Sequence, residues 1–457
     1  MIESNIFREY DIRGVIGKDL TIEAAEDIGM AFGTYLKKRG LHNISLARDG
    51  RLSSRDIHDS VIRGLLSTGV NITDLGVCPT PLLYFSLFQL EVEGGLMITG
   101  SHNPSDYNGF KLCVGKDTLY GEEIQELRRI IERNDFETGK GELTRLEIIP
   151  SYINCLKENF NGINISNIKV VTDSGNGTAG MVAPQILSEM GCEVIELFSK
   201  VDGNFPNHHP DPTIPDNLKS LIAKVSEEGA DFGIGYDGDA DRIGVVDENG
   251  EVLWGDKLLI IFARDILEKR PSSTFISEVK SSQVLYDDIE KRGGKAIMWK
   301  TGHSLIKSKI KETGAVLAGE MSGHIFFADR YFGYDDAIYA SCRLVEILNK
   351  FKSKDANFKG LSRLLDDIPE TYSTPEIRIE SPDDKKFKIV EKIKERFSKE
   401  YKVIDVDGAR ILFEDGWGLV RASNTQPVLV LRFEANSKER LNEIREYVER
   451  ELKKIEV

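Results

Sequence analysis

The first residue of this chain that could do chemistry is a serine on a short loop. Residues 98–111 read ITGSHNPSDYNGFK, so Ser101 follows an apolar run and stands beside His102. Gly100 permits a sharp backbone turn next to the hydroxyl, and the Asn-Pro pair that follows prevents a helix from starting there. We therefore expect a hydroxyl presented on a loop rather than in a core. It could act as a nucleophile, as a phosphate carrier or only as a turn residue.

Three aspartates alternate in the segment GIGYDGDADRIGVV, directly after a strand predicted at Phe232–Tyr236. In an extended stretch, Asp237, Asp239 and Asp241 would share one side. Three carboxylates there repel one another unless a cation neutralises them, and their hard oxygen ligands favour Mg²⁺ or Ca²⁺ over Zn²⁺. Arg242 would suit a phosphate oxygen shared with the metal. A solvated acidic turn is the plain alternative.

A second polar turn is GEMSGH, Gly319–His324, in which two glycines flank a carboxylate, a hydroxyl and an imidazole. Glu320 and Ser322 could form hydrogen bonds with sugar hydroxyls, and His324 could serve as an acid or base near neutral pH. An ordinary glycine-rich turn between strands would have the same composition.

Another polar loop is expected in RASNTQPVLVLRFEA, before a strand predicted at Val428–Phe433. Arg421, Ser423, Asn424 and Thr425 would bring side-chain and backbone donors together for a phosphate, with bidentate bonds from the arginine. A hairpin turn rich in serine and asparagine is the alternative reading of the same residues.

Four further side chains are candidates for the same site. Arg13 in YDIRG and Lys111 in NGFK are cations that could lie near Ser101, although a surface salt bridge is the usual role of a single basic residue. Lys280 and His303 follow predicted strands, at the strand ends where ligands gather in parallel sheets.

Two kinds of catalysis can be weighed from these residues. A Ser–His–Asp hydrolase needs a nucleophile elbow, G-x-S-x-G, which TGSHNP does not supply. His102 is also too close in the sequence to act easily as the base for Ser101. A carboxylate loop for a metal, several anion sites and a loop serine fit phosphoryl transfer, because that chemistry is mostly positioning and charge neutralisation.

The composition narrows the class of protein. The chain has 457 residues, with 60 Lys plus Arg, 75 Asp plus Glu and a net charge of -15. Such an acidic chain argues against general binding of nucleic acid, although a local basic cluster can still hold a small anion. Five scattered cysteines without a C-x-x-C pair favour free thiols in a reducing compartment. Without an apolar signal core or a membrane-length apolar run, we expect a cytoplasmic protein.

The elements that must position these loops follow a repeated pattern. Residues 44–76, 168–198 and 273–302 each read as an apolar strand, a polar loop, a helix, a glycine and a second strand. Such units imply parallel pairing through a right-handed crossover. The residues from about 367 onward do not follow this repeat. Strands with alternating apolar and polar residues, together with helices at 384–399 and from Ser437, indicate an antiparallel sheet with helices on one face.

The predicted fold class is α/β: three related α/β domains plus a C-terminal α+β domain, packed around a common space because the linkers are short and polar. Each predicted domain carries one loop. The serine loop belongs to 1–147, the aspartate loop to 148–250, the GEMSGH turn to 251–366 and the arginine loop to 367–457.

Together the segments resemble the α-D-phosphohexomutase family, over the whole chain and in the family's order. FREYDIRG, TGSHNPSDYNGFK, DGDADR, GEMSGH and RASNTQP follow one another. The GEMSGH form is similar to the phosphomannomutase/phosphoglucomutase branch, whereas the phosphoglucosamine mutase branch usually carries a different residue where Met321 stands. The resemblance implies four domains around a central cleft.

The resemblance also implies an activity, the reversible transfer of a phosphoryl group between O1 and O6 of a mannose or glucose phosphate. Ser101 would carry the group, and a hexose 1,6-bisphosphate would be the intermediate. Mg²⁺ would bind Asp237, Asp239, Asp241 and a phosphoserine oxygen on Ser101, and glucose or mannose 1,6-bisphosphate would be the activator. The implied catalytic residues are Ser101, His102, Lys111, Arg13, Arg242 and His324. The implied substrate-binding residues are Lys280, His303, Glu320, Ser322, His324, Arg421, Ser423, Asn424 and Thr425.

Some alternatives stay open at this point. Phosphoglucosamine mutase is the nearest, a metal-dependent sugar-phosphate phosphatase belongs to another class, and a non-catalytic sensor would need a broken serine or aspartate loop. The expected partner is a hexose phosphate, without nucleic acid or membrane, and the chain would be a monomer or dimer. The proton acceptor stays open among His102, His324 and Lys111.

Overall fold

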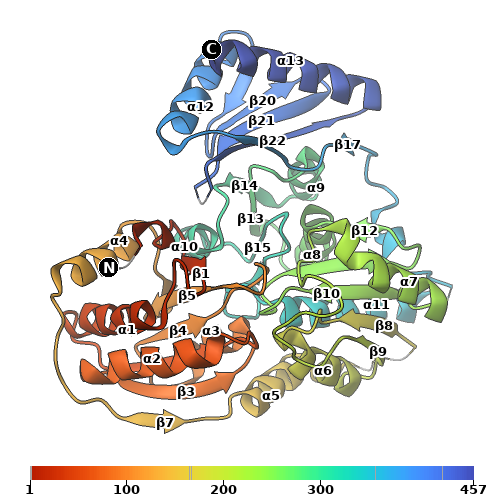
Figure 1. Ribbon diagram of the computed structural model, residues 1–457. Coiled ribbons are helices and arrows are strands. Elements are labelled where there is room, and N and C mark those ends of the chain that lie inside the picture. The colour runs from red at the N-terminus through yellow and green to blue at the C-terminus, as the bar shows by residue number, and fades with distance from the viewer. Residues whose placement is uncertain (1–2, 164, 166, 356, 425, 457) are drawn as a thin grey trace.

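The computed structural model describes residues 3–163, 165, 167–355, 357–424 and 426–456, and these form four β-sheets in succession along the chain (Figure 1). Sheets of seven, five and four strands are combined with helices, and a six-stranded sheet follows near the C-terminus. This order confirms the predicted fold class, three α/β domains followed by an α+β domain. The exact domain boundaries stay a prediction.

The first sheet has the order β1-β5-β4-β2-β3-β7, with β6 beside β5. Its strands are β1 (Ile12–Val15), β2 (Asn43–Arg48), β3 (Asn71–Val77), β4 (Gly94–Ile98), β5 (Tyr107–Val114), β6 (Asp117–Thr118) and β7 (Leu143–Arg145). Its helices are α1 (Ile22–Lys37), α2 (Ser54–Ser67), α3 (Thr80–Gln89) and α4 (Glu122–Arg133). The predicted repeat is confirmed, because α2 links the parallel strands β2 and β3. The serine loop leaves the carboxyl end of the fully buried β4.

The second sheet has the order β12-β11-β10-β8-β9. Its strands are β8 (Lys169–Asp173), β9 (Glu193–Leu197), β10 (Phe232–Tyr236), β11 (Ile243–Asp247) and β12 (Val252–Leu253), and its helices are α5 (Ile149–Asn159), α6 (Ala183–Glu189) and α7 (Lys219–Glu228). Here β8 is parallel to both β9 and β10, whereas β11 returns antiparallel to β10. The three aspartates occupy the tight turn between β10 and β11.

The third sheet has the order β14-β13-β15-β16. Its strands are β13 (Thr274–Glu278), β14 (Lys295–Trp299), β15 (Leu317–Gly319) and β16 (Ile325–Phe327), and its helices are α8 (Gly255–Lys269), α9 (Gln283–Lys291), α10 (His303–Thr313) and α11 (Ala337–Lys354). The strands β13, β14 and β15 are parallel, and β16 turns back beside β15. The GEMSGH turn therefore joins β15 to β16.

The fourth sheet is antiparallel throughout its described pairs, as predicted, and has the order β17-β22-β21-β20-β19 with β18 beside β22. Its strands are β17 (Tyr372–Ser373), β18 (Ile377–Glu380), β19 (Lys402–Ile404), β20 (Ala409–Phe413), β21 (Gly416–Ala422) and β22 (Val428–Ala435). The helices α12 (Asp383–Phe397) and α13 (Lys438–Glu456) cover one face of it (Figure 1).

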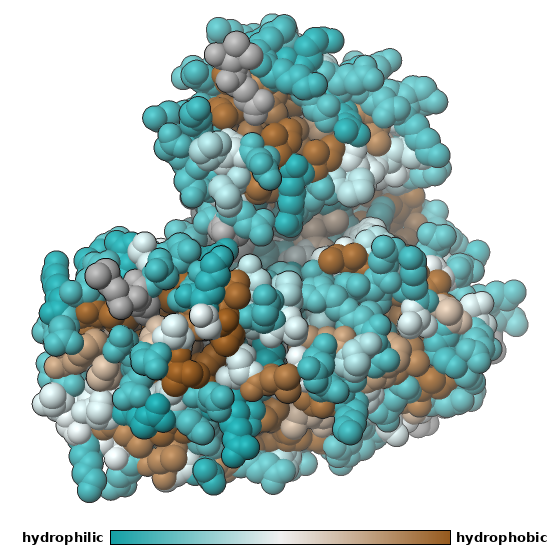
Figure 2. Space-filling view, viewed as in Figure 1, coloured by the Kyte–Doolittle hydropathy of each residue, from teal (hydrophilic) through white to brown (hydrophobic). Residues whose placement is uncertain are grey.

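One hydrophobic core runs through parts of all three α/β domains. It includes Phe85 on α3, Tyr152 on α5, Ile234 on β10 and Tyr339 on α11, all of them buried. The C-terminal sheet has a core of its own, shared with α12 and α13. The first three domains are therefore packed as a unit, while the fourth stands above them, and the surface is hollowed between it and the body below (Figure 2).

The C-terminal sheet contacts the third domain through its second face. Alternate residues of β21 point to opposite sides, so Val420 lies in the core with the helices while Trp417 and Leu419 pack on Val279. Arg410 lies over the Trp417 ring and donates to the Val279 carbonyl (2.6 Å). This small interface holds the fourth domain against the loop after β13.

Among the described residues, no helix has both the length and the apolar composition needed to cross a bilayer.

The core of the C-terminal domain offers a matched test of burial. Phe433 on β22 is fully buried, whereas Phe387 on α12 is 52% exposed. Phe433→Ala should lower the free energy of unfolding by about 3–5 kcal/mol, because it removes a packed ring and leaves a cavity. Phe387→Ala should change it by less than about 0.5 kcal/mol. Urea unfolding followed by tryptophan fluorescence, to which the buried Trp417 of this domain contributes, measures both, and equal effects would contradict the packing described.

Candidate active site

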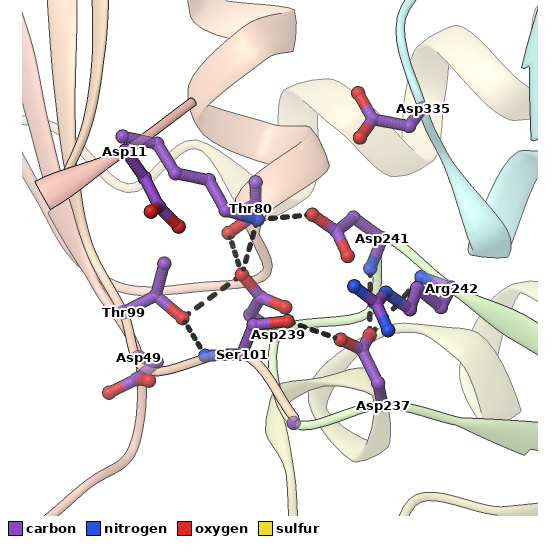
Figure 3. Close-up of polar contacts among 12 residues, drawn as sticks. Asp11, Asp49, Thr80, Thr99, Ser101, Asp237, Asp239, Asp241, Arg242 and Asp335 are labelled. Carbon is purple, nitrogen blue, oxygen red and sulfur yellow. Dashed lines mark hydrogen bonds and ion pairs between the residues drawn. The ribbon is translucent and has the colours of Figure 1, made fainter. Parts of the chain in front are cut away.

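Ser101 lies on a loop as predicted, but it is only 2% exposed, because the aspartate loop (Asp237–Arg242) covers it. Its Oγ donates to Asp237 Oδ2 at 2.7 Å (Figure 3). The same Oγ lies 3.1 Å from His102 Nδ1. The backbone of Ser101 has a positive φ of 48°. Its N–H is held by Thr99 Oγ1 at 2.8 Å. The hydroxyl is thus fixed in one place, in a backbone conformation that non-glycine residues seldom adopt.

The three aspartates are fully buried and close together. Asp237, Asp239 and Asp241 each offer a carboxylate oxygen, and these oxygens lie within 4.8 Å of one another. Backbone amides of the same turn hold Asp237, since Asp241 N and Arg242 N both donate to its Oδ1 at 3.1 Å. Burial, with repulsion from the other two carboxylates, raises the pKa of Asp237 well above its ordinary value.

Two oxygens of this cluster are left without a hydrogen-bond donor. Asp239 Oδ2 accepts from Thr80 Oγ1 (2.6 Å) and Thr99 Oγ1 (3.0 Å), yet Asp239 Oδ1 and Asp241 Oδ1 are buried with no hydrogen-bond partner among the described residues. Buried carboxylate oxygens are costly unless they are paired or coordinate a cation. The donor set is all oxygen, so the residues fit a hard divalent cation.

Lys111 is the cation nearest to these carboxylates. It projects from β5, is 3% exposed at its side chain, and pairs with Asp239 Oδ2 at 3.0 Å and with Asp241. Burial alone would lower the pKa of Lys111, but the two carboxylates outweigh it and raise the pKa above its ordinary value. One ammonium faces three carboxylates, which leaves a net negative charge for a metal to balance.

Arg13 and Arg242 are the predicted arginines near the serine and aspartate loops. Arg13, on β1, donates to Asn103 Oδ1 at 3.2 Å and pairs with Asp11 at 2.6 Å. Arg242 ends the aspartate loop, and its Nε donates to His324 Nε2 at 2.9 Å. Both predicted cations therefore lie at the site rather than in remote surface salt bridges.

The two candidate histidines differ in their partners. His102 is half-buried, and desolvation, with the charges of Arg242 and Arg13, lowers its pKa well below the ordinary value. His324 Nδ1 lies 3.0 Å from Asp335 Oδ2, and its ring stacks on His303 at 5.5 Å between centroids. Asp335 thus fixes the orientation of His324, whose Nε2 lone pair faces Arg242. His303 lies beside this pair at the first turn of α10.

The GEMSGH turn is tied to the aspartate loop. Ile243 N donates to Gly323 O at 3.0 Å, and any Cβ on Gly323 (φ +89°) would meet Ile243 O at 2.2 Å. Glu320 is buried, and its Oε1 accepts from Gly302 N at 2.7 Å. Burial, with the nearby Glu278, raises the pKa of Glu320. Ser322 is half-buried at the tip of the turn.

The predicted phosphate loop (residues 421–425) is only partly a loop in the structure. Arg421 is not on the loop but is the next-to-last residue of the buried strand β21, where it pairs with Asp407 Oδ2 at 3.0 Å. Ser423 Oγ accepts from Gln426 N (3.2 Å), and Asn424 Nδ2 donates to Tyr10 Oη (2.8 Å). Thr425 lies outside the described residues.

Lys280 sits under the C-terminal domain. Its Nζ pairs with Glu376 at 2.7 Å and Glu278 at 3.4 Å, and Arg432 Nη1 donates to its carbonyl at 2.8 Å. Attraction from Lys280 lowers the pKa of Glu376 to about 2. Lys280 and Arg421 are therefore buried cations, each already facing a carboxylate.

Tyr10 connects the arginine loop to the segment at Thr301 and Gly302, which lies next to the GEMSGH turn. Its hydroxyl donates to Thr301 O at 3.0 Å and accepts from Asn424. Thr301 N in turn donates to Asp407 Oδ2 (3.1 Å), the carboxylate that holds Arg421. Because Gly302 also binds Glu320, the arginine loop, the GEMSGH turn and the N-terminal segment meet around one space.

Sequence reasoning missed several partners of these residues. Asp335 stands beside Asp336, the N-cap of α11, and the DD pair gives no signal as to which one serves the cap. Thr80 could have been noticed as a hydroxyl at a helix start, but not its 159-residue reach to Asp239. Glu376 and Asp407 lie in segments without a motif, so only the fold places them on Lys280 and Arg421.

The chain matches four successive family models along almost its whole length. They are described as phosphoglucomutase/phosphomannomutase α/β/α domain I over residues 4–138, domain II over 150–250, domain III over 254–372, and C-terminal domain over 376–451. This is the order of the four sheets.

Known proteins are similar over the full length. A phosphomannomutase/phosphoglucomutase of Pseudomonas aeruginosa is 47% identical over 456 residues, covering 100% of this chain and 97% of its own. A phosphoglucomutase of Neisseria gonorrhoeae is 44% identical over 448 residues, covering 97% and 95%.

A solved structure supports the same assignment. The crystal structure of a phosphoglucomutase/phosphomannomutase family protein of Burkholderia thailandensis superposes with a TM-score of 0.93 at 41% identity, over 100% of this chain and 98% of its own. The similarity to this structure and the four family matches agree with the resemblance noted in the sequence. They also agree with the site geometry, in which the serine, aspartate, GEMSGH and arginine segments meet around one space. The chain belongs to the phosphoglucomutase/phosphomannomutase family.

Proposed function

We propose that the protein moves a phosphoryl group between O1 and O6 of a hexose phosphate, with Ser101 as the carrier and a hexose 1,6-bisphosphate as the intermediate. The observation that carries the proposal is the Ser101 hydroxyl bound to Asp237, inside a buried cluster of three aspartates. The names of the relatives, phosphomannomutase/phosphoglucomutase and phosphoglucomutase, support mannose and glucose phosphates as substrates.

The proposed reaction has two balanced halves. In the first, the bond between phosphorus and Ser101 Oγ breaks and Oγ takes up a proton, while a bond between phosphorus and O6 of the hexose 1-phosphate forms and O6 gives its proton to a base. The bisphosphate then rotates in the site so that its two phosphates exchange places. In the second, the bond from phosphorus to O1 breaks and O1 regains the proton held by the base, while Ser101 Oγ gives up its proton and bonds to phosphorus again, which leaves the 6-phosphate.

His324 is the group best suited to exchange the proton of the sugar hydroxyl. Lys111 is held by two carboxylates that keep it protonated, so it can neutralise charge but makes a poor base. His102 lies on the seryl oxygen, within 3.1 Å of Oγ, and suits the proton of Ser101 rather than that of the sugar. His324 shares the GEMSGH turn with Glu320 and is oriented by Asp335 through Nδ1. Its Nε2 would act as the base once Arg242, which now donates to it, turns to a phosphoryl oxygen.

The charge on the transferring group would be met from several sides. Asp237, Asp239 and Asp241 would hold Mg²⁺, which when bound would neutralise them and draw charge from the phosphoryl oxygens. Arg13, beside Asn103, Arg242, at the end of the aspartate loop, and Lys111, on Asp239 and Asp241, would supply further positive charge to the same group. Such fixed positive charge is the main catalytic device in phosphoryl transfer.

The distant phosphate would bind at the opposite end of the space. Arg421, Ser423 and Asn424, with Thr425 as a further expected donor, would hold it in both orientations of the intermediate, and Lys280 would add a second cation. Glu320 and Ser322 would hold the sugar hydroxyls, with His303 lining the same side. This division explains why the site draws on all four domains.

The cellular setting is part of the proposal. We propose a cytoplasmic monomer or dimer that binds hexose phosphates and neither nucleic acid nor membrane, with glucose or mannose 1,6-bisphosphate as activator. The five cysteines are all free thiols, which suits a reducing compartment. The net charge of -15 argues against nucleic acid.

The carrier role of Ser101 is tested by mass and by activity. The purified protein should carry one phosphoryl group on the peptide that contains Ser101, and Ser101→Ala should lose both the added mass and mutase activity. Glucose, mannose and glucosamine 1-phosphates are assayed at equal concentrations with Mg²⁺ and glucose 1,6-bisphosphate, and we expect glucose or mannose to turn over fastest. Ser60→Ala, at a serine on α2 away from the site, is the control.

Three outcomes would contradict this proposal. Full activity in Ser101→Ala would show that Ser101 does not carry the phosphoryl group. Release of inorganic phosphate without a bisphosphate would indicate a phosphatase instead. A clear preference for glucosamine 1-phosphate would make the enzyme a phosphoglucosamine mutase.

The metal site is tested by binding rather than by turnover. Calorimetric titration of the phosphorylated protein should give one Mg²⁺ site, and Asp239→Asn should weaken it by about tenfold or more, because a charged ligand is lost. Asp216→Asn, at an exposed aspartate, should leave the dissociation constant unchanged. Equal affinity in the two variants would place the metal elsewhere.

The role of His324 is tested by its kinetic signature. His324→Asn should lower kcat by about 10²–10⁴-fold, the usual range for general acid–base catalysis, with Ser101 still phosphorylated. Asp335→Asn should lower kcat in the same direction, because it removes the partner of Nδ1. His42→Asn, at an exposed histidine, is the control. Unchanged kcat in His324→Asn would return the role to Lys111 or His102.

A further inference from the structure

Arg51 is a fully buried arginine that the proposed reaction does not use. It follows β2, is 2% exposed, and its guanidinium lies beneath the loop that carries Ser101. Nη2 donates to Ser101 O (2.8 Å) and Asn103 O (2.5 Å). Nη1 donates to Pro104 O (2.5 Å) and Tyr107 O (3.1 Å). All four Nη hydrogens are therefore donated to backbone carbonyls of one loop, between Ser101 and Tyr107.

Asp49 fixes this guanidinium to the start of the same loop. Its Oδ2 pairs with Arg51 Nε at 3.2 Å and also accepts from Gly100 N at 3.0 Å. Its Oδ1 accepts from Arg51 N and Ser54 Oγ, so the carboxylate is itself held in place. The Arg51–Asp49 pair thus contacts the loop on both sides of Ser101.

Gly100 is required by this arrangement. A Cβ at position 100 would stand 2.3 Å from Arg51 Nε and 2.4 Å from its Cζ. The guanidinium cannot step aside without giving up its hydrogen bonds to the loop carbonyls. From the second domain, the Phe205 ring lies 5.1 Å from the guanidinium carbon, so the arginine is also enclosed on that side.

We propose that Arg51 is the positioning residue for Ser101, holding the strained serine loop in the one backbone conformation that aims Oγ at the aspartate cluster. The proposal rests on the proposed role of Ser101 as phosphoryl carrier. A lysine could not replace it, because an ammonium has three donors and no planar fork to reach four carbonyls. Without the fork, the positive φ of Ser101 would relax and Oγ would leave its place near Asp237.

The consequence is a specific kinetic signature. Displacing a reacting atom by about 1 Å can cost about 10²-fold in rate without loss of binding. In Arg51→Lys we expect the single-turnover rate of phosphoryl transfer from phosphorylated enzyme to glucose 1-phosphate to fall about 100-fold, with KM changed less than about threefold. Transfer to water should fall less, because water needs no defined approach, so the ratio of sugar to water transfer drops.

The experiment compares four variants in the full-length protein, each phosphorylated with glucose 1,6-bisphosphate and quantified by intact mass. Gly100→Ala leaves the arginine in the chain but displaces its guanidinium, and should reproduce the signature of Arg51→Lys. Phe205→Leu removes only the enclosing ring of a half-buried side chain, so it folds and should give a weaker effect in the same direction. Arg343→Lys is the matched control, because Arg343 is equally buried, on α11, and pairs with Asp329 away from the site.

All rates are normalised to the folded, phosphorylated fraction, and thermal midpoints are measured in parallel. The inference is overturned if the ratio of sugar to water transfer in Arg51→Lys, or in Phe205→Leu should the other variants not fold, equals that of Arg343→Lys. A fall in stability alone would not move this ratio. If the unsubstituted protein carries no phosphoryl group on Ser101, the proposed function fails instead, and the two failures are thereby distinguished.

Discussion

The structure depends on three buried aspartates whose negative charge the surrounding residues balance only in part. Three aspartates follow one buried strand into a turn of six residues, and the water that would stabilise them is excluded. Two of their oxygens have no hydrogen-bond donor in the described part of the chain. Hydroxyls from Thr80 and Thr99 and the ammonium of Lys111 reduce this cost only in part. An isolated buried cluster of this kind would be strongly destabilising, so its presence indicates a cation as its completing partner.

The surrounding fold keeps these carboxylates in a fixed position next to the Ser101 hydroxyl. Thr80 N and Thr178 N donate to the carbonyls of Asp239 and Gly238, and Ala337 N donates to Ala240 O, so all three α/β domains bind the backbone of one short turn. Their shared core prevents the turn from shifting relative to the serine loop. The precision of the site therefore comes from packing at the domain junction rather than from either loop alone.

Much of this could be predicted from local pattern. The three strand–helix–strand units, the antiparallel C-terminal sheet and the oxygen-rich turn after β10 follow from periodicity and spacing, and the structure confirms them. The burial of Ser101 could not, because it arises when a loop 136 residues away covers the hydroxyl. The place of Arg421 on a strand, and the carboxylates of Asp407 and Glu376 that face Arg421 and Lys280, depend on long-range contacts for which the sequence has no periodic signal. Arg51 looked like any charged residue before a helix.

The separate core of the C-terminal domain has a mechanical consequence. The end of the site around Ser101 is built into a core common to three domains, whereas the end around Arg421 is carried by a sheet with its own core. That sheet is joined to the rest through Trp417, Arg410 and a few polar contacts such as that of Tyr10. The distance between the Ser101 hydroxyl and Arg421 is therefore the dimension of the molecule that can change most easily, and the shared core around Ser101 is the fixed frame from which that change is measured.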